Sequence, residues 1–113
     1  MWVSLMTRLV LFMRATLILV ALFSSQSFAL EHVTARVTAL EPTYLPGLIT
    51  FQIDQPTSKC VKGGWIKWSK TEENNKAVYS TLLAALSSQS PIRLFFEETD
   101  TECKASYLHI LSN

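Results

Sequence analysis

The clearest pattern in the chain is an alternation of apolar and polar residues in two segments, residues 32–40 (HVTARVTAL) and 48–54 (LITFQID). A period of two residues is typical of a strand with one buried face. The inward positions of the first strand are then Val33, Ala35, Val37 and Ala39, and those of the second are Ile49, Phe51 and Ile53.

Three further segments predict shorter strands, at residues 65–68, 92–98 and 105–111. Loops rich in proline, glycine and serine separate them, and Gly63 and Gly64 indicate a turn or bulge. Alternation assigns inward positions to Ile66 and Trp68, to Ile92, Leu94 and Phe96, and to Leu108 and Ile110.

Between the third and fourth predicted strands, the apolar period changes to that of a helix. Ser69 followed by Glu72 resembles a capping box, and the pattern continues to about Ser88 before Pro91. At 3.6 residues per turn one face collects the apolar residues Val78, Tyr79, Leu82, Leu83, Ala85 and Leu86.

The order of elements is therefore strand, strand, strand, helix, strand, strand. A mainly β chain with one helix in this position (β-β-β-α-β-β) matches a small OB-like, partly closed antiparallel barrel. An open sheet with the helix on one face is the alternative.

The opposite face of the predicted helix is neutral. It carries Ala77, Ser80, Thr81, Ala84 and Ser88, and no charged residue occurs between Lys76 and Arg93. Small side chains allow another surface to approach closely, so this face is a candidate oligomer interface. The alternative is that these residues are simply compatible with a helix.

The N-terminal segment has the features of a signal peptide. Arg8 and Arg14 precede an apolar run at residues 15–23, and small residues at Ser27 and Ala29 fit a cleavage site after residue 29. We expect residues 1–29 to be removed and residues 30–113 to form a single domain in the periplasm or outside the cell. An uncleaved N-terminal anchor is the alternative.

Charge and cysteine content fit an exported domain. Residues 30–113 hold eight Lys or Arg and nine Asp or Glu, which gives no basic surface for nucleic acid or anionic lipid. Both cysteines, Cys60 and Cys103, lie in this part of the chain. Exported small domains are normally oxidised, so we predict one structural disulfide; a redox or metal pair would favour closer spacing or partner histidines.

The stretch WIKW (residues 65–68) places two tryptophans in one short strand. If Ile66 and Trp68 face inward, then Trp65 and Lys67 face outward, as does Phe95 on the fourth strand. An exposed aromatic ring beside a donor can stack on a sugar or contact another subunit, so Trp65, Lys67 and Phe95 are candidate ligand or interface residues. A tryptophan exposed without either role is the alternative.

The sequence contains no recognisable catalytic or metal-binding motif. The two histidines of residues 30–113, His32 and His109, stand apart in sequence, and there is no nucleophile elbow or phosphate loop. The acidic stretch at residues 97–102 lacks the ligand spacing of a calcium loop and indicates a solvated turn. We therefore expect no cofactor, no resident metal and no enzymatic activity.

One conditional metal site remains. Cleavage after residue 29 would leave Leu30, Glu31 and His32 at the new N-terminus, where amine, amide and imidazole nitrogens can bind Cu(II) in a square plane. A strand start with a coincidental histidine is the alternative. Mass spectrometry that finds another N-terminus on the exported protein would exclude the copper site.

From Cys60 to Ile110 the chain resembles a group of small exported proteobacterial proteins. The shared features are Cys60, Trp65, a helix at residues 76–85 (KAVYSTLLAA), the strand Ile92 to Phe96, and Cys103. This layout is similar to the receptor-binding B subunits of subtilase-type cytotoxins. The resemblance implies an OB-like fold, a homo-oligomer that is pentameric in the toxins, a sialylated glycan as ligand and an enzymatic A subunit as partner.

These observations favour a secreted or periplasmic, non-catalytic binding module, in particular a lectin-like homo-oligomer. A small periplasmic enzyme or inhibitor, and an envelope protein without a ligand, are the alternatives.

Overall fold

The computed structural model describes residues 30–113. The predicted signal peptide and its cleavage site at residues 1–29 lie outside the described residues, and so does any anchor formed by them. Within residues 30–113 no helix is both long and apolar enough to cross a membrane.

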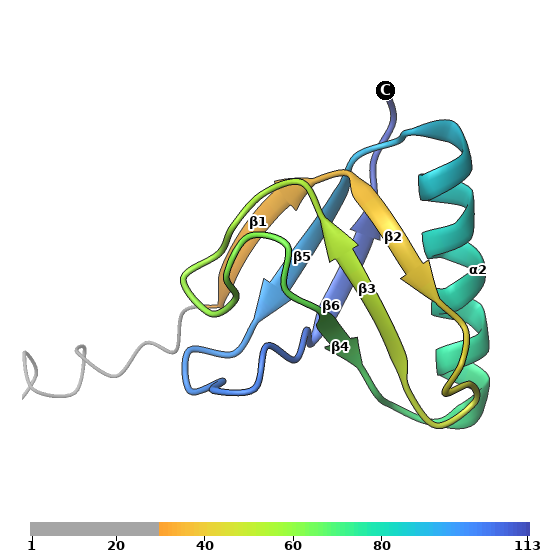
Figure 1. Cartoon of the computed structure of the whole chain (residues 1–113), viewed down its shortest axis with the longest axis horizontal. Coiled ribbons are helices and arrows are strands. Elements are labelled where there is room, and N and C mark those ends of the chain that lie inside the picture. The colour runs from red at the N-terminus through yellow and green to blue at the C-terminus, as the bar shows by residue number, and fades with distance from the viewer. Residues whose placement is uncertain (1–29) are drawn as a thin grey trace, which may run out of the picture.

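Six strands and one helix form the domain (Figure 1). Their bounds are β1 (Glu31–Ala35), β2 (Val37–Glu41), β3 (Ile49–Ile53), β4 (Ile66–Trp68), α2 (Glu72–Ser88), β5 (Ile92–Phe96) and β6 (Tyr107–Ile110). The helix lies along one side of the sheets, and the long loops β3–β4 and β5–β6 lie on the side away from it.

The strands form two antiparallel sheets of three, in the orders β1-β5-β6 and β2-β3-β4. The sheets meet at two places. β1 runs into β2 through Arg36, and a parallel bridge joins Lys67 in β4 to Lys104 before β6. The two sheets are therefore not closed into a barrel, and the structure confirms the predicted small, partly closed, mainly β fold, with one helix between β4 and β5.

The predicted first strand, residues 32–40, is wrong as a single element, because the chain changes sheets at Arg36. The backbone N–H of Arg36 donates to Asp54 Oδ1 at 2.8 Å, and the N–H of Asp54 donates back to the Arg36 carbonyl at 3.1 Å. A bulge follows between Val37 and Ala39, so Leu40 instead of Ala39 packs against the core.

The core lies between the two sheets and α2. Most inward positions predicted by alternation are buried, among them Phe51, Ile66, Trp68 and Phe96. Ile110 is an exception, because it stands at the end of β6 and is 45% exposed. The full buried apolar set is Ala35, Val37, Ile49, Phe51, Ile53, Cys60, Ile66, Trp68, Leu82, Ala85, Ile92, Leu94, Phe96 and Ala105.

The helix begins two residues later than a cap at Ser69 requires. Thr71 is the N-cap, and its side chain accepts a hydrogen bond from the backbone N–H of Asn74 at 3.2 Å. Ser69 instead donates to the carbonyl of Gly47. The predicted end at Ser88 is confirmed, and Gln89 follows in the left-handed conformation of a C-cap.

One member of the predicted apolar face is solvent exposed. Leu83 is 44% exposed because it lies at the margin of the arc that packs against the sheets. The buried side of the helix includes Asn75, a polar residue that is completely inaccessible to solvent, together with Leu82 and Ala85.

Candidate ligand-binding surfaces

A row of aromatic and imidazole rings crosses the outer face of the β1-β5-β6 sheet. The strand register places Phe95 opposite both His32 and Tyr107, and His109 stands next along β6. From Phe95, the ring centroids lie 5.7 Å away for His32, 6.5 Å for Tyr107 and 5.1 Å for His109. We call these four residues the ring row.

The ring row is accessible to a ligand. His32, Tyr107 and His109 are exposed, with Tyr107 at 54%, and Phe95 at their centre is half-buried. Tyr107 and His109 pack edge-to-face on Phe95 and His32 is tilted against it, and aromatic pairs of this kind contribute about 0.5–1.5 kcal/mol beyond their buried area. A fixed, partly exposed aromatic surface suits stacking on a flat apolar ligand face.

The surroundings of the ring row are polar and carry positive charge. Arg93 lies opposite both Thr34 and His109 in the register, which places it one step along from Phe95 on the same outer face. The outward positions of the three strands hold no carboxylate (His32, Thr34, Arg93, Phe95, Tyr107 and His109). This face therefore offers aromatic faces and hydrogen-bond donors together.

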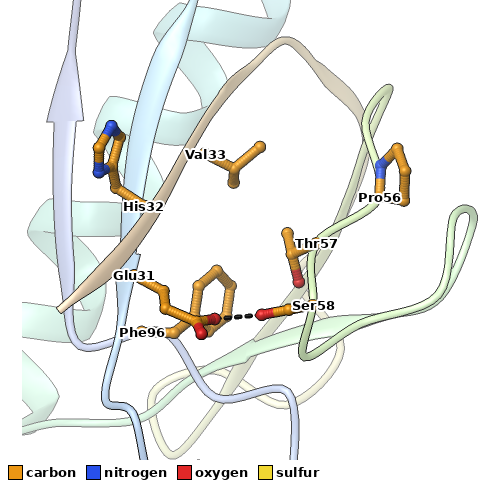
Figure 2. A pocket seen from close by; sticks show the side chains of 7 residues that line it. All are labelled: Glu31, His32, Val33, Pro56, Thr57, Ser58 and Phe96. Atoms are coloured by element: carbon orange, nitrogen blue, oxygen red, sulfur yellow. Dashed lines mark hydrogen bonds between the residues drawn. The ribbon is translucent and has the colours of Figure 1, made fainter. Parts of the chain in front are cut away.

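A groove of about 480 Å³ opens on the other side of β1, between this strand and the loop after β3 (Figure 2). It is lined by Glu31, His32, Val33, Pro56, Thr57, Ser58 and Phe96. The hydroxyl of Ser58 donates to the carboxylate of Glu31 across the groove. Figure 2 shows the imidazole of His32 turned away from the loop residues, so Glu31 is the ionisable side chain that faces the groove.

The structure places the three predicted ligand residues on two different sheets. Trp65, which is 45% exposed, immediately precedes β4, and Lys67 is exposed within it, on the β2-β3-β4 sheet. Phe95 belongs to β5 of the other sheet. Trp65 and Lys67 thus form one candidate surface, and Phe95 belongs to the ring row.

The predicted interface on the helix lies on its exposed side. Ala77, Ser80 and Ala84 are exposed, and Thr81 is half-buried. The hydroxyls of Ser80, Thr81 and Ser88 each donate to the carbonyl four residues earlier, at 3.2, 3.1 and 2.8 Å. These hydroxyls already have partners, so covering this face would leave few polar groups without hydrogen bonds.

The predicted disulfide between Cys60 and Cys103 is present, with Cα atoms 5.3 Å apart. It joins the loop before β4 to the loop before β6. The adjacent backbone makes the same connection, because the N–H of Lys67 donates to the carbonyl of Cys103 at 3.0 Å. The disulfide therefore supports the junction between the two sheets.

In residues 30–113 no group of three or more histidine, cysteine or acidic side chains is arranged to hold a metal ion. The acidic stretch forms a turn in which Asp100 accepts hydrogen bonds from the backbone N–H groups of Glu102 and Lys104. Glu31 and His32 lie in β1, so copper binding through their backbone nitrogens would compete with the start of that strand. The copper site stays a hypothesis.

The sequence pattern does not predict the ring row. Because Leu108 and Ile110 are inward positions, alternation directs Tyr107 and His109 outward, as it does Phe95, but it goes no further. Their proximity depends on which strands are neighbours and in which register, and alternation carries no information on either.

Comparison of the chain with protein-family models, with curated proteins and with solved structures found no match.

Proposed function

We propose that this protein is an exported, non-catalytic carbohydrate-binding module that works as a homo-oligomer. The observation that carries the ligand class is the ring row, with Phe95 held between three exposed rings on a face that also bears Arg93. Sugars present flat C–H faces for stacking and hydroxyl groups for hydrogen bonds. Aromatic rings beside donors therefore match both parts of such a ligand.

Export is supported by the N-terminal pattern and by the disulfide, which persists in oxidising compartments. Self-association is supported by the neutral, exposed side of α2 with its internally bonded hydroxyls. The resemblance to toxin B subunits adds three more specific proposals: a pentamer, a sialylated glycan and an enzymatic partner subunit.

A glycan array probed with residues 30–113 tests the ligand class. We expect binding to at least one glycan series, and loss of that binding in Phe95→Ala and Tyr107→Ala. Trp65→Ala is the matched control, because it removes an exposed aromatic ring from the other sheet.

The alternative outcomes are distinct. Binding that is lost in Trp65→Ala and kept in Phe95→Ala would move the site to the β2-β3-β4 sheet. A correctly folded wild-type protein that binds no glycan on the array would contradict carbohydrate binding.

A further inference from the structure

The junction between the two sheets leaves one edge of β6 open. Two backbone hydrogen bonds close the junction: Lys67 N–H to the Cys103 carbonyl and Ala105 N–H to the Lys67 carbonyl, both at 3.0 Å. After Ala105 the segments diverge. Within residues 30–113, β6 therefore pairs only with β5.

The free edge offers backbone groups in a known order. The N–H of Leu111 donates to the carbonyl of Pro91 at 2.8 Å, on the β5 side. Backbone groups of successive strand residues point to alternate sides. The N–H and C=O groups of Leu108 and Ile110 therefore point away from β5, towards the free edge.

A cleft of about 490 Å³ runs along this edge. One wall consists of four consecutive residues, 106–109. Consecutive residues of a strand belong to opposite faces, so they can line one cleft together only where it follows the strand's edge. The other wall is formed by Trp68, Lys70, Thr71, Asn74 and Val78, from the end of β4, the segment that joins it to α2, and the first half of α2.

We propose that the cleft between β6 and α2 binds an extended peptide, which adds a strand to the free edge of β6. Strand addition supplies main-chain hydrogen bonds, and pockets for alternate side chains supply selectivity. This site is separate in ligand class from the carbohydrate surface, although Tyr107 and His109 border both.

The lining defines the chemistry of the peptide. Val78 on one wall and Leu108 on the other offer apolar contacts for alternate small apolar side chains, and the indole N–H of Trp68 is already bonded to Asn74 Oδ1 at 2.9 Å. Lys70 is the one lysine or arginine in the lining, which contains no carboxylate. The complementary peptide is an extended, apolar-alternating segment with an acidic residue placed beside Lys70.

A single peptide fits this cleft better than a second folded copy of the chain. The helix contacts β6 directly, so the space beside the strand is bounded by α2. If a second copy paired one of its own edge strands with β6, the rest of that strand's sheet would overlap the volume occupied by α2.

The test uses residues 30–113 and an acetylated heptapeptide of alternating valine and threonine that ends in glutamate. Two further versions carry N-methyl groups on either the odd or the even amides. We expect the unmodified peptide to bind and to slow hydrogen exchange at the backbone amides of Leu108 and Ile110. One of the two methylated peptides should bind and the other should not. Equal effects of both patterns, no protection at these two amides, or no binding at millimolar peptide would overturn the proposal.

The charge preference is tested with Lys70→Glu, and Lys62→Glu in the exposed β3–β4 loop is the matched control. Lys70→Glu should weaken binding of the glutamate peptide about tenfold (about 1.4 kcal/mol) and favour a lysine-ended version, because it replaces an attraction between opposite charges by a repulsion between like charges. Equal effects of the two substitutions would contradict an acidic residue at Lys70. This experiment measures peptide binding and the glycan array measures carbohydrate binding. A failure of the carbohydrate proposal can therefore be distinguished from a failure of the peptide proposal.

Discussion

At the scale of single residues, Asn75 has the most constrained environment. Its side chain is fully buried on the inner face of α2 and makes two hydrogen bonds to backbone groups. Its amide nitrogen donates to the carbonyl of Pro46 at 2.7 Å, and its oxygen accepts from the N–H of Lys70 at 2.8 Å. Asn75 thereby connects the loop before β3 and the segment before α2, and both connections depend on one side chain.

Asn75→Ala should lower the free energy of unfolding by about 2–4 kcal/mol, because it leaves two backbone groups without their partners. Asn74→Ala is the comparison: this neighbouring side chain is exposed and makes one hydrogen bond through its oxygen, from the Trp68 indole N–H at 2.9 Å, so its loss should cost about 1 kcal/mol. Chemical denaturation measures both values. Equal losses would show that the second hydrogen bond and the full burial of Asn75 contribute nothing beyond one side-chain hydrogen bond.

The two tryptophans of residues 65–68 should respond oppositely to truncation. Trp68 is 4% exposed in the core and Trp65 is 45% exposed. Trp68→Ala should cost about 3–5 kcal/mol, enough to unfold a domain of this size, and Trp65→Ala should remain folded. Circular dichroism melting curves of the two variants check this, and a folded Trp68→Ala with an unfolded Trp65→Ala would show that the faces of β4 are inverted.

At the scale of elements, α2 has two sides with different roles. One side packs against the sheets through Val78, Leu82 and Leu86. The other is exposed and carries no charged residue from Ala77 to Ser88, and its hydroxyls bond back to the helix. Burying this side in an interface would require little desolvation of charged groups.

Ala84→Glu should shift the protein towards monomer, because it places an unpaired charge at the centre of the exposed side. Size-exclusion chromatography with light scattering measures the effect. Val61→Glu, which makes the same charge change at an 81% exposed loop position, is the control. A wild-type protein that stays monomeric at high micromolar concentration would contradict the proposed interface.

At the scale of the whole molecule, two junctions hold the sheets together. The first is the corner at Arg36, where paired hydrogen bonds to Asp54 fix the passage from β1 to β2. The second is the contact of Lys67 with the segment before β6, which the Cys60–Cys103 disulfide reinforces. The gap beyond the second junction is the cleft beside β6.

Replacing both cysteines by alanine should lower stability by about 4 kcal/mol, the chain-entropy value for a closed loop of this size (sequence separation 43). For one small core this is a large part of the total. Denaturant titration of the double variant against the oxidised wild type measures the loss. Two free thiols in the untreated wild-type protein would show that the bond does not form.

Local patterns predicted the elements well and the candidate site poorly. Alternation correctly identified the buried faces of β3, β4 and β5, and periodicity placed α2 to its last residue. The split at Arg36 was not predictable in this way, because residues 32–40 alternate without interruption. The ring row was missed for a similar reason, since His32 meets Phe95 only through the pairing of β1 with β5, and these two strands are far apart in sequence.

The sequence by itself determined the type and order of the elements, the disulfide and the inward residues of most strands. These follow from local periods of two and 3.6 residues and from there being only two cysteines. Only the tertiary structure decided where the chain passes from one sheet to the other and which rings meet around Phe95. It also decided that Asn75, a polar residue, takes a place in the core where an apolar residue is expected. Each of these depends on hydrogen bonds or packing between distant segments, and strand register fixes such contacts only when the whole domain has folded.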